Sequence, residues 1–211
     1  MTDNCPKCWA DLRTPLFCES CDEVLDTQND SPFRILGMAQ GFHLDRMSLR
    51  KRLLHLSRHL HPDVHGTADD ATRDLAQRKT AELNAAFQIL EDDFRRASWL
   101  VRSLGGPTEE TEPQMPQAFL TEVLEWNEAV EEARTSEPGS TESARLAGLE
   151  DELRSERKKL MDGVAAKLTP LPELGSPELV EVRHKLNALR YLDRTLCQLE
   201  ELRLKQANSP S

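Results

Sequence analysis

Apolar residues recur at helical spacing along most of this chain. Between residues 46 and 60, one stripe with steps of four, three and four is formed by Leu49, Leu53, Leu56 and Leu60. After a polar gap, a second stripe is formed by Leu83, Ala86, Phe87, Leu90 and Phe94. Such stripes are typical of amphipathic helices that bury one face. We therefore predict a helix that begins near Asp45 and a longer helix over residues 70–94, preceded by a short helix capped by Ser31.

Three further helical patterns occupy residues 118–206, and polar loops at 136–140 and 169–172 separate them. The first pattern has a stripe of Phe119, Val123, Trp126 and Val130. The second has Leu146, Leu149, Leu153, Leu160, Val164 and Leu168, and the third has Val182, Leu186, Leu189, Leu196 and Leu199. Short loops between leucine-striped helices predict an antiparallel three-helix bundle. The predicted fold class is therefore all-α: a helical hairpin, then this bundle, with a small metal-bound hairpin at the N-terminus.

Shifts in composition predict the domain boundaries. Residues 1–22 hold four of the five cysteines, and the polar, acidic residues 23–31 form a short linker. The first helical domain spans residues 32–105 and ends at two glycines and a proline. The Pro- and Glu-rich residues 106–117 are a second linker, residues 118–206 form the bundle, and residues 207–211 are a tail.

The cysteines form two CxxC turns. Cys5 and Cys8 belong to the first turn and Cys18 and Cys21 to the second, with nine residues between the turns. Two such turns place four thiolates around one ion, which is typical of structural zinc. A pair of disulfides and an iron–sulfur cluster are the alternatives, and a reducing cytoplasm disfavours the first. Cys197 lies alone in a late helix, where we expect it to be a buried, small apolar residue.

Basic side chains cover the helix that begins near Asp45 on the side opposite its leucine stripe. Lys51, His55 and Arg58 lie there, flanked by Arg50, Arg52 and His59. Leu54 points to the same side, where core packing does not explain it. The tripeptide His61-Pro62-Asp63 follows, and by itself it is consistent with a simple helix-breaking turn. Between two helices it resembles instead the contact loop of a J-domain, the module that stimulates ATP hydrolysis by DnaK-type chaperones.

Two leucines in the first bundle helix lie off its core stripe. Leu120 and Leu124 project a quarter to a third of a turn away, beside Glu125, Glu128 and Glu132. In the last helix Tyr191 falls nearly opposite the stripe, so we expect it to be exposed. Packing against the rest of the protein is one explanation for these side chains, and a protein-binding surface is the other.

The net charge of −10 argues against nucleic-acid binding, because phosphate contacts need clustered Lys and Arg. This charge also disfavours a zinc-bearing regulator of nucleic acid. The sequence has no Ser/Cys–His–Asp grouping and no phosphate-binding loop, so we expect neither catalysis nor a bound nucleotide of its own. No apolar run approaches the length of a bilayer span, and the N-terminus lacks a signal sequence. We expect a cytoplasmic protein, or a mitochondrial matrix protein if it is a processed eukaryotic form.

The whole chain resembles the HscB co-chaperones of iron–sulfur cluster assembly, called Jac in yeasts. The resemblance rests on the J-domain pattern followed by a three-helix domain, and on three stretches: 97–101, 119–125 and 189–193. The double CxxC extension is similar to that of human-type members. The resemblance implies a co-chaperone that binds an IscU-type scaffold protein and delivers it to an HscA- or DnaK-type chaperone. A J-domain protein that serves a different client through its bundle is the alternative.

The resemblance also implies roles for individual residues. The chaperone-binding residues would be His61, Pro62, Asp63, Arg50, Lys51, Leu54, His55 and Arg58. The scaffold-binding residues would be Leu120, Leu124, Glu125, Glu128, Glu132 and Tyr191. Thr121 departs from the family pattern, in which a larger apolar residue is usual at this position.

Overall fold

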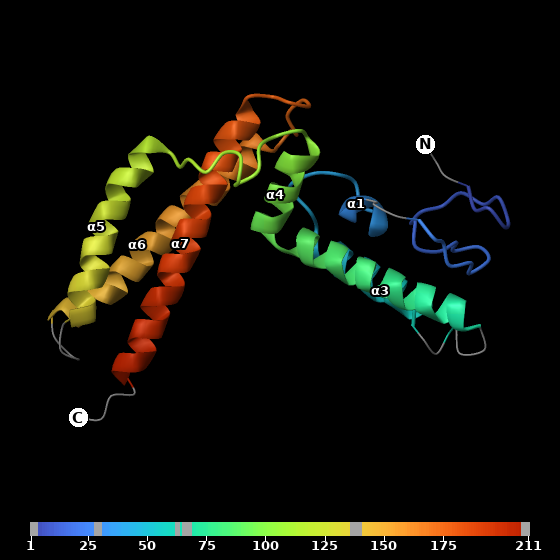
Figure 1. The fold of residues 1–211 in the computed structure, drawn as a ribbon, viewed down its shortest axis with the longest axis horizontal. Helices are drawn as coiled ribbons and strands as arrows, with labels where there is room; N and C mark the ends of the chain where they lie inside the picture. Colours follow the sequence, from blue (N-terminus) through green and yellow to red (C-terminus); the bar gives the residue numbers. More distant parts are fainter. Residues whose placement is uncertain (1–3, 28–30, 62–63, 65–68, 136–140, 208–211) are drawn as a thin grey trace. The chain divides into compact units, whose positions relative to one another are not determined.

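A computed structural model describes residues 4–27, 31–61, 64, 69–135 and 141–207. The described residues form helices and no strands, apart from two isolated bridges in the cysteine-rich segment. The all-α prediction is therefore confirmed. The chain divides into two compact units, Met1–Trp99 and Leu100–Ser211, which we call the first and second units (Figure 1). None of the described helices combines the length and hydropathy that crossing a bilayer requires.

Three helices form the centre of the first unit: α1 (Pro32–Ile35), α2 (Arg46–His59) and α3 (Asp70–Glu91). The predicted caps are present, since the Ser31 side chain accepts a hydrogen bond from the amide of Arg34, and Asp45 accepts from two amides at the start of α2. Both α1 and α2 pack on α3. Their shared core consists of Phe33, Leu36, Leu49, Leu56, Leu60, Leu83, Ala86 and Leu90.

The predicted helix over residues 70–94 ends earlier than expected. Helix α3 stops at Glu91, and α4 (Asp93–Ser103) begins after the extended residue Asp92. The Asp92 side chain accepts a hydrogen bond from the amide of Arg95 at 2.7 Å, which satisfies one of the free donors at the start of α4. A local cap therefore interrupts a stripe that looks continuous in the sequence.

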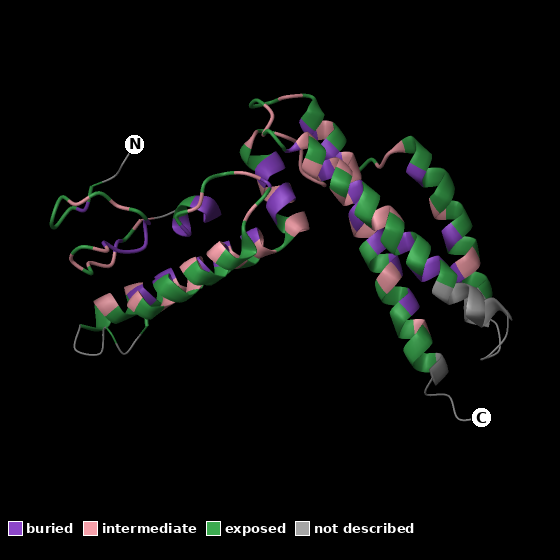
Figure 2. Ribbon diagram, turned by 180° about the vertical axis from the view of Figure 1, so that it is seen from behind, coloured by how far each residue is buried: buried purple, intermediate pink, exposed green. Residues whose placement is uncertain are grey.

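The second unit contains α5 (Gln117–Thr135), α6 (Thr141–Lys167) and α7 (Glu178–Ala207). Helix α7 packs along α6, and α5 contacts both of them. In Figure 2 the buried residues gather on one side of each helix, as the leucine stripes predict. The predicted stripe residues Leu153, Val164, Val182, Leu186 and Leu189 are all buried.

Residues 106–117, predicted as a linker, lie against α7. The amide of the Asn187 side chain donates to the carbonyls of Glu112 and Gln114, at 2.8 and 2.7 Å. Arg190 pairs with Glu109, and His184 lies 3.2 Å from a carboxylate oxygen of Glu112. The segment is therefore fixed to the second unit by polar contacts. The predicted domain boundaries themselves stay predictions.

Candidate functional site

The four N-terminal cysteines converge on one point. The sulfur atoms of Cys5, Cys8, Cys18 and Cys21 all lie within 4.8 Å of one another. The Cys5–Cys21 and Cys8–Cys18 sulfur distances are 3.7 and 3.5 Å. Four thiolates around a zinc ion at about 2.3 Å require sulfurs about 3.8 Å apart, so the spacing fits a tetrahedral ion. A disulfide needs about 2.05 Å, and all four cysteines are free thiols.

The two CxxC turns have the same local geometry. In each, the amide two residues after the first cysteine points at that cysteine's sulfur, from Lys7 and from Ser20, both at 3.4 Å. Each turn then closes with a hydrogen bond of 2.9 Å from the amide four residues on, and that residue, Trp9 or Asp22, has a positive φ. Amides aimed at sulfur favour the thiolate form, which is the metal-binding form.

The thiols also influence each other's protonation. Burial raises the pKa of the Cys18 thiol, but amide hydrogen bonds from Ser20 and Cys21 and the neighbouring sulfurs lower it overall to about 7. At Cys21 an amide hydrogen bond from Glu23 lowers the pKa of the thiol. Burial and the three other sulfurs outweigh this effect and raise the pKa to about 12. Metal binding would need all four thiols to lose their protons, because the thiolate is the form that binds a metal ion.

The second CxxC turn lies against α2. One carboxylate oxygen of Glu19 is 3.6 Å from the Arg52 guanidinium and 3.5 Å from the His55 ring, and Asp22 lies 3.5 Å from His59. The Phe17 ring stacks on the His59 ring at 4.8 Å between centroids. Sequence reasoning missed these contacts, because no local pattern links residues that lie more than 30 positions apart.

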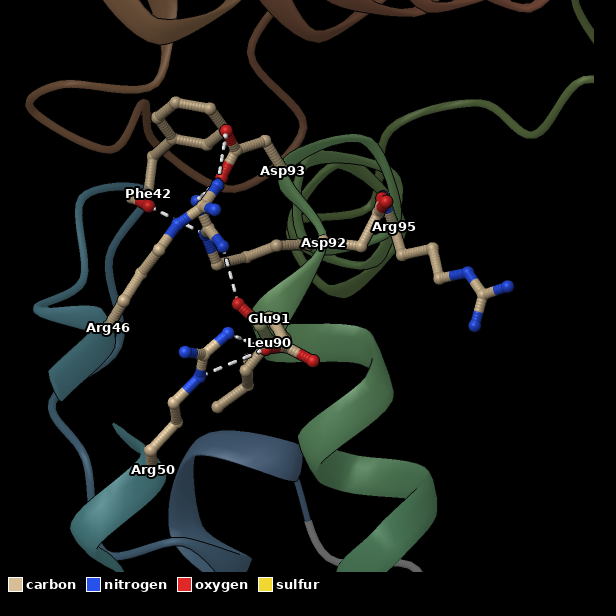
Figure 3. A network of polar contacts seen from close by, with 9 residues as sticks. Phe42, Arg46, Arg50, Leu90, Glu91, Asp92, Asp93 and Arg95 are labelled. Atoms are coloured by element: carbon tan, nitrogen blue, oxygen red, sulfur yellow. Dashed lines mark hydrogen bonds and ion pairs between the residues drawn. The ribbon is translucent and has the colours of Figure 1, made fainter. Parts of the chain in front are cut away.

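The predicted chaperone-binding residues on α2 are all exposed, and two of them also lie beside acidic side chains of the first unit. Lys51, Leu54, His55 and Arg58 are exposed, and Leu54 keeps 60% of its surface accessible. Arg50 is exposed as well, and its guanidinium also pairs with Glu91 at 2.8 Å (Figure 3). His61 is exposed, whereas Pro62 and Asp63 lie outside the described residues.

A network at the junction of α3 and α4 holds α2 in place (Figure 3). Arg46 pairs with Asp93 at 3.2 Å beside the Arg50–Glu91 pair. At its centre the buried Arg96 donates to the carbonyls of Phe42 and Leu90 and to Asp93, and its guanidinium lies 5.0 Å above the Phe42 ring. The predicted basic face of α2 therefore includes residues that stabilise the unit.

In the second unit, the outer face of α5 carries apolar and acidic side chains. Leu120 and Leu124 are 37% and 65% exposed, and Glu125, Glu128 and Glu132 are exposed beside them. The prediction that Tyr191 is exposed is wrong, because it is half-buried against α5. Its hydroxyl and the Asn127 side-chain carbonyl are 2.7 Å apart, and its ring meets the Phe119 ring edge-on.

Sequence reasoning misjudged the burial of one residue of the second unit and missed the position of another. The prediction that Cys197 is buried is wrong, because this cysteine is exposed on α7. It lies one residue after the half-buried Leu196 and two before the buried Leu199, just off the apolar stripe. Asn127 was missed, although it lies three and seven residues after Leu124 and Leu120, and helical spacing places all three on one face.

Several known proteins are similar to this chain in sequence. The model of the HSCB C-terminal oligomerisation domain matches residues 115–200. The co-chaperone protein HscB homolog of Paraburkholderia phytofirmans is 33% identical over 135 residues, which cover 63% of this chain and 76% of the relative. The homolog of Pasteurella multocida is 26% identical over 177 residues, which cover 83% of this chain and 97% of the relative.

A solved structure has the same fold along nearly the whole chain. The crystal structure of the human co-chaperone protein HscB matches with a TM-score of 0.74 and 21% sequence identity. The match covers 97% of this chain and 98% of the human one.

Proposed function

The chain belongs to the HscB family of co-chaperones, and from this premise we propose that it is a J-domain co-chaperone of iron–sulfur cluster assembly. It binds an IscU-type scaffold protein through its second unit and presents the scaffold to an HscA- or DnaK-type chaperone through its first unit. The chaperone hydrolyses the ATP, and this protein stimulates the hydrolysis without catalytic residues or a nucleotide of its own.

One observation carries this proposal: each unit exposes a leucine whose charged neighbours all have the same sign. Leu54 is 60% exposed between the basic Lys51 and Arg58, and Leu124 is 65% exposed beside Glu125 and Glu128. An exposed leucine within charged surroundings supplies an apolar anchor, and the charges around it guide the encounter with a partner. Opposite charges on the two units support two different partners.

The chaperone-facing surface would be formed by the exposed residues of α2 together with the loop that begins at His61. Arg50 would act indirectly in this surface, since its pairing with Glu91 holds α2 on the α3–α4 junction. Pro62 and Asp63 belong to the same proposal on sequence grounds alone. The surface would meet an acidic face of the chaperone.

The scaffold-facing surface would centre on Leu120 and Leu124, with Glu125, Glu128 and Glu132 around them. Tyr191 would contribute the exposed part of its ring, which Asn127 and Phe119 hold in one orientation. An aromatic ring fixed in this way loses little entropy on binding, which favours it as an anchor.

We further propose that the four cysteines hold a structural zinc ion. The full set of four sulfur ligands leaves no open position for a substrate, which supports a structural role. The ion would supply the folding free energy that so small a segment lacks.

The scaffold-binding part is tested with Leu124→Ala. We expect titration calorimetry with an IscU-type scaffold to give an affinity lowered by about tenfold or more, as for a buried interface anchor. Leu204→Ala is the matched control, because Leu204 is also on the second unit and is 59% exposed. Equal affinities for the two variants would place the scaffold site elsewhere.

A further inference from the structure

Residues 106–116, which we call the strap, connect α4 to α5 without a helix of their own. The connection is longer than the usual length of about four to six residues. Figure 1 shows it crossing α7 before α5 begins, and its hydrogen bonds to α7 lie within the second unit. Neither the metal centre nor the proposed partner surfaces use these contacts.

The middle of the strap is held by Asn187, a residue of α7 that is only 7% exposed. Its side-chain nitrogen donates to the carbonyls of Glu112 and Gln114 at 2.8 and 2.7 Å. Its side-chain oxygen accepts from the Nε of Arg183 at 2.9 Å. Both donors and the acceptor of the amide are therefore used, whereas an aspartate of the same shape would have no donor for the two carbonyls.

The turns of α7 on either side of Asn187 hold the strap as well. Arg190 pairs with Glu109, and the His184 ring lies 3.2 Å from a carboxylate oxygen of Glu112. Residues 184, 187 and 190 follow at steps of three, so helical spacing places them on one side of α7. The strap is therefore fastened to that side at three successive positions.

Packing fixes the start of the strap. A Cβ on Gly106 would lie 2.7 Å from a side-chain carbon of Val101 and 2.8 Å from the Cβ of Leu179, so this position has no room for a side chain. The Gly106 amide donates to the Val101 carbonyl at 2.8 Å. The strap is therefore held both shortly after α4 and at Gln114, close to the start of α5.

The strap ends where the proposed scaffold-facing surface begins. Gln114 lies three residues before α5, and Leu120 is in the first turn of that helix. Tyr191, the part of the surface that α7 supplies, lies one turn after Asn187. Helix α5 packs more extensively on α6 than on α7, so the strap fixes its first turns against α7, where its own packing is limited.

We propose that Asn187 is a positioning residue for scaffold binding. By holding the strap on α7, it keeps Leu120 and Leu124 of α5 beside Tyr191, so that one partner meets all three side chains. A surface arranged before the partner arrives loses less conformational freedom on binding. Asn187 is buried, so it acts through the placement of α5 and not by touching the partner. The inference rests on the proposed scaffold-facing surface.

The placement of α5 is tested first without any partner. Asn187→Asp keeps the shape of the side chain and the acceptor for Arg183, and it removes both donors to the strap. We expect amide hydrogens of the full chain to exchange about threefold faster or more in residues 112–121, measured by mass spectrometry, because local opening becomes easier. Glu109→Gln is a milder second variant that removes only the pair with Arg190, and it should act in the same direction.

Glu150→Gln is the control for a general loss of stability. Glu150 is a buried carboxylate of α6 that pairs with Arg154 and with Arg203. Arg203 lies about three and a half turns beyond Arg190 on α7, so this pair is remote from the strap. The control variant should lower the urea midpoint of the second unit and leave exchange in residues 112–121 unchanged.

Scaffold binding is tested next, by titration calorimetry with an IscU-type scaffold. Asn187→Asp should weaken the affinity about tenfold, and Glu150→Gln should stay within about twofold of the wild type. Leu124→Ala should cost less affinity in the Asn187→Asp background than in the wild type, because a misplaced α5 presents Leu124 to the partner less well. A merely destabilising effect of Asn187→Asp would leave the loss from Leu124→Ala the same in both backgrounds.

Three results would each overturn the proposal: unchanged exchange in Asn187→Asp, unchanged scaffold affinity in Asn187→Asp, or an equal loss from Leu124→Ala in both backgrounds. A wild type that does not bind the scaffold, or binding that Leu124→Ala leaves unchanged, would contradict the proposed function instead. The exchange measurement uses no scaffold, so it decides in either case whether Asn187 places α5.

Discussion

At the scale of single residues, neighbouring basic side chains on α2 have different roles. Arg52 is half-buried and binds the carbonyl of Leu36, and Arg50 pairs with Glu91 although it is exposed, as Lys51 and Arg58 are. The sequence predicts the basic face, because helical spacing is local. It does not separate the two roles, because the partners that decide them lie 16 and 41 residues away.

The carboxylate of Asp93 gives a pH-dependent prediction at this scale. Burial raises its pKa, but Arg96 and Arg46 together lower it below the ordinary value. A lowered folded-state pKa stabilises the protein above the unfolded pKa of about 3.9, and this contribution is lost as the pH falls through the folded pKa. Asp93→Asn should therefore lower the urea midpoint of the first unit at neutral pH. The deficit should shrink below about pH 4.

The control for this prediction is Asp162→Asn, at an exposed position on α6. Its urea midpoint should match that of the wild type throughout. If the deficit of Asp93→Asn is as large at acid pH as at neutral pH, the charge of the carboxylate does not stabilise the unit.

At the scale of elements, the cysteine-rich segment depends on two supports. Its own core is small, with Cys5, Leu16, Phe17, Cys18 and Leu25 buried. The metal centre would join its two turns, and the second turn contacts the C-terminal half of α2 through Glu19, Asp22 and Phe17. Loss of the metal should therefore affect α2 as well as the segment itself.

Cys18→Ser tests this link. We expect the variant to bind less zinc and to exchange amide hydrogens faster both in the cysteine-rich segment and around His55 and His59, measured by mass spectrometry. Exchange in the second unit should stay unchanged. Cys197→Ser is the matched control, because Cys197 is exposed on α7 and lies outside the metal centre. Faster exchange confined to the cysteine-rich segment would show that the contacts with α2 do not support the helix.

At the scale of the whole molecule, the helices and the cysteine site could be predicted because both depend on short-range spacing. Apolar steps of three and four define the helices, and two CxxC turns bring the sulfurs together. The prediction for Tyr191 was wrong because its ring packs against α5 although it lies nearly opposite the stripe of its own helix. The prediction for Cys197 was wrong because this residue lies just off the stripe, where packing against a neighbouring helix decides burial. The contacts between the cysteine-rich segment and α2 have no sequence signal, because only the fold brings those residues together.

The proposed division of the molecule makes separate variants possible. Leu54 is on the first unit and Leu124 on the second, and both are exposed to a similar extent. A substitution at Leu54 should weaken binding of the chaperone alone. A substitution at Leu124 should weaken binding of the scaffold alone. A protein that joins two partners should need both surfaces at once.

The most direct test is the steady-state ATPase rate of an HscA- or DnaK-type chaperone with this protein, with and without an IscU-type scaffold. We predict that the wild type and scaffold together stimulate the rate more than the sum of their separate effects. His61→Gln should abolish stimulation, Leu54→Ala should reduce it in both conditions, and Leu124→Ala should lose only the added effect of the scaffold. Stimulation that the scaffold does not increase, or that His61→Gln retains in full, would contradict the account.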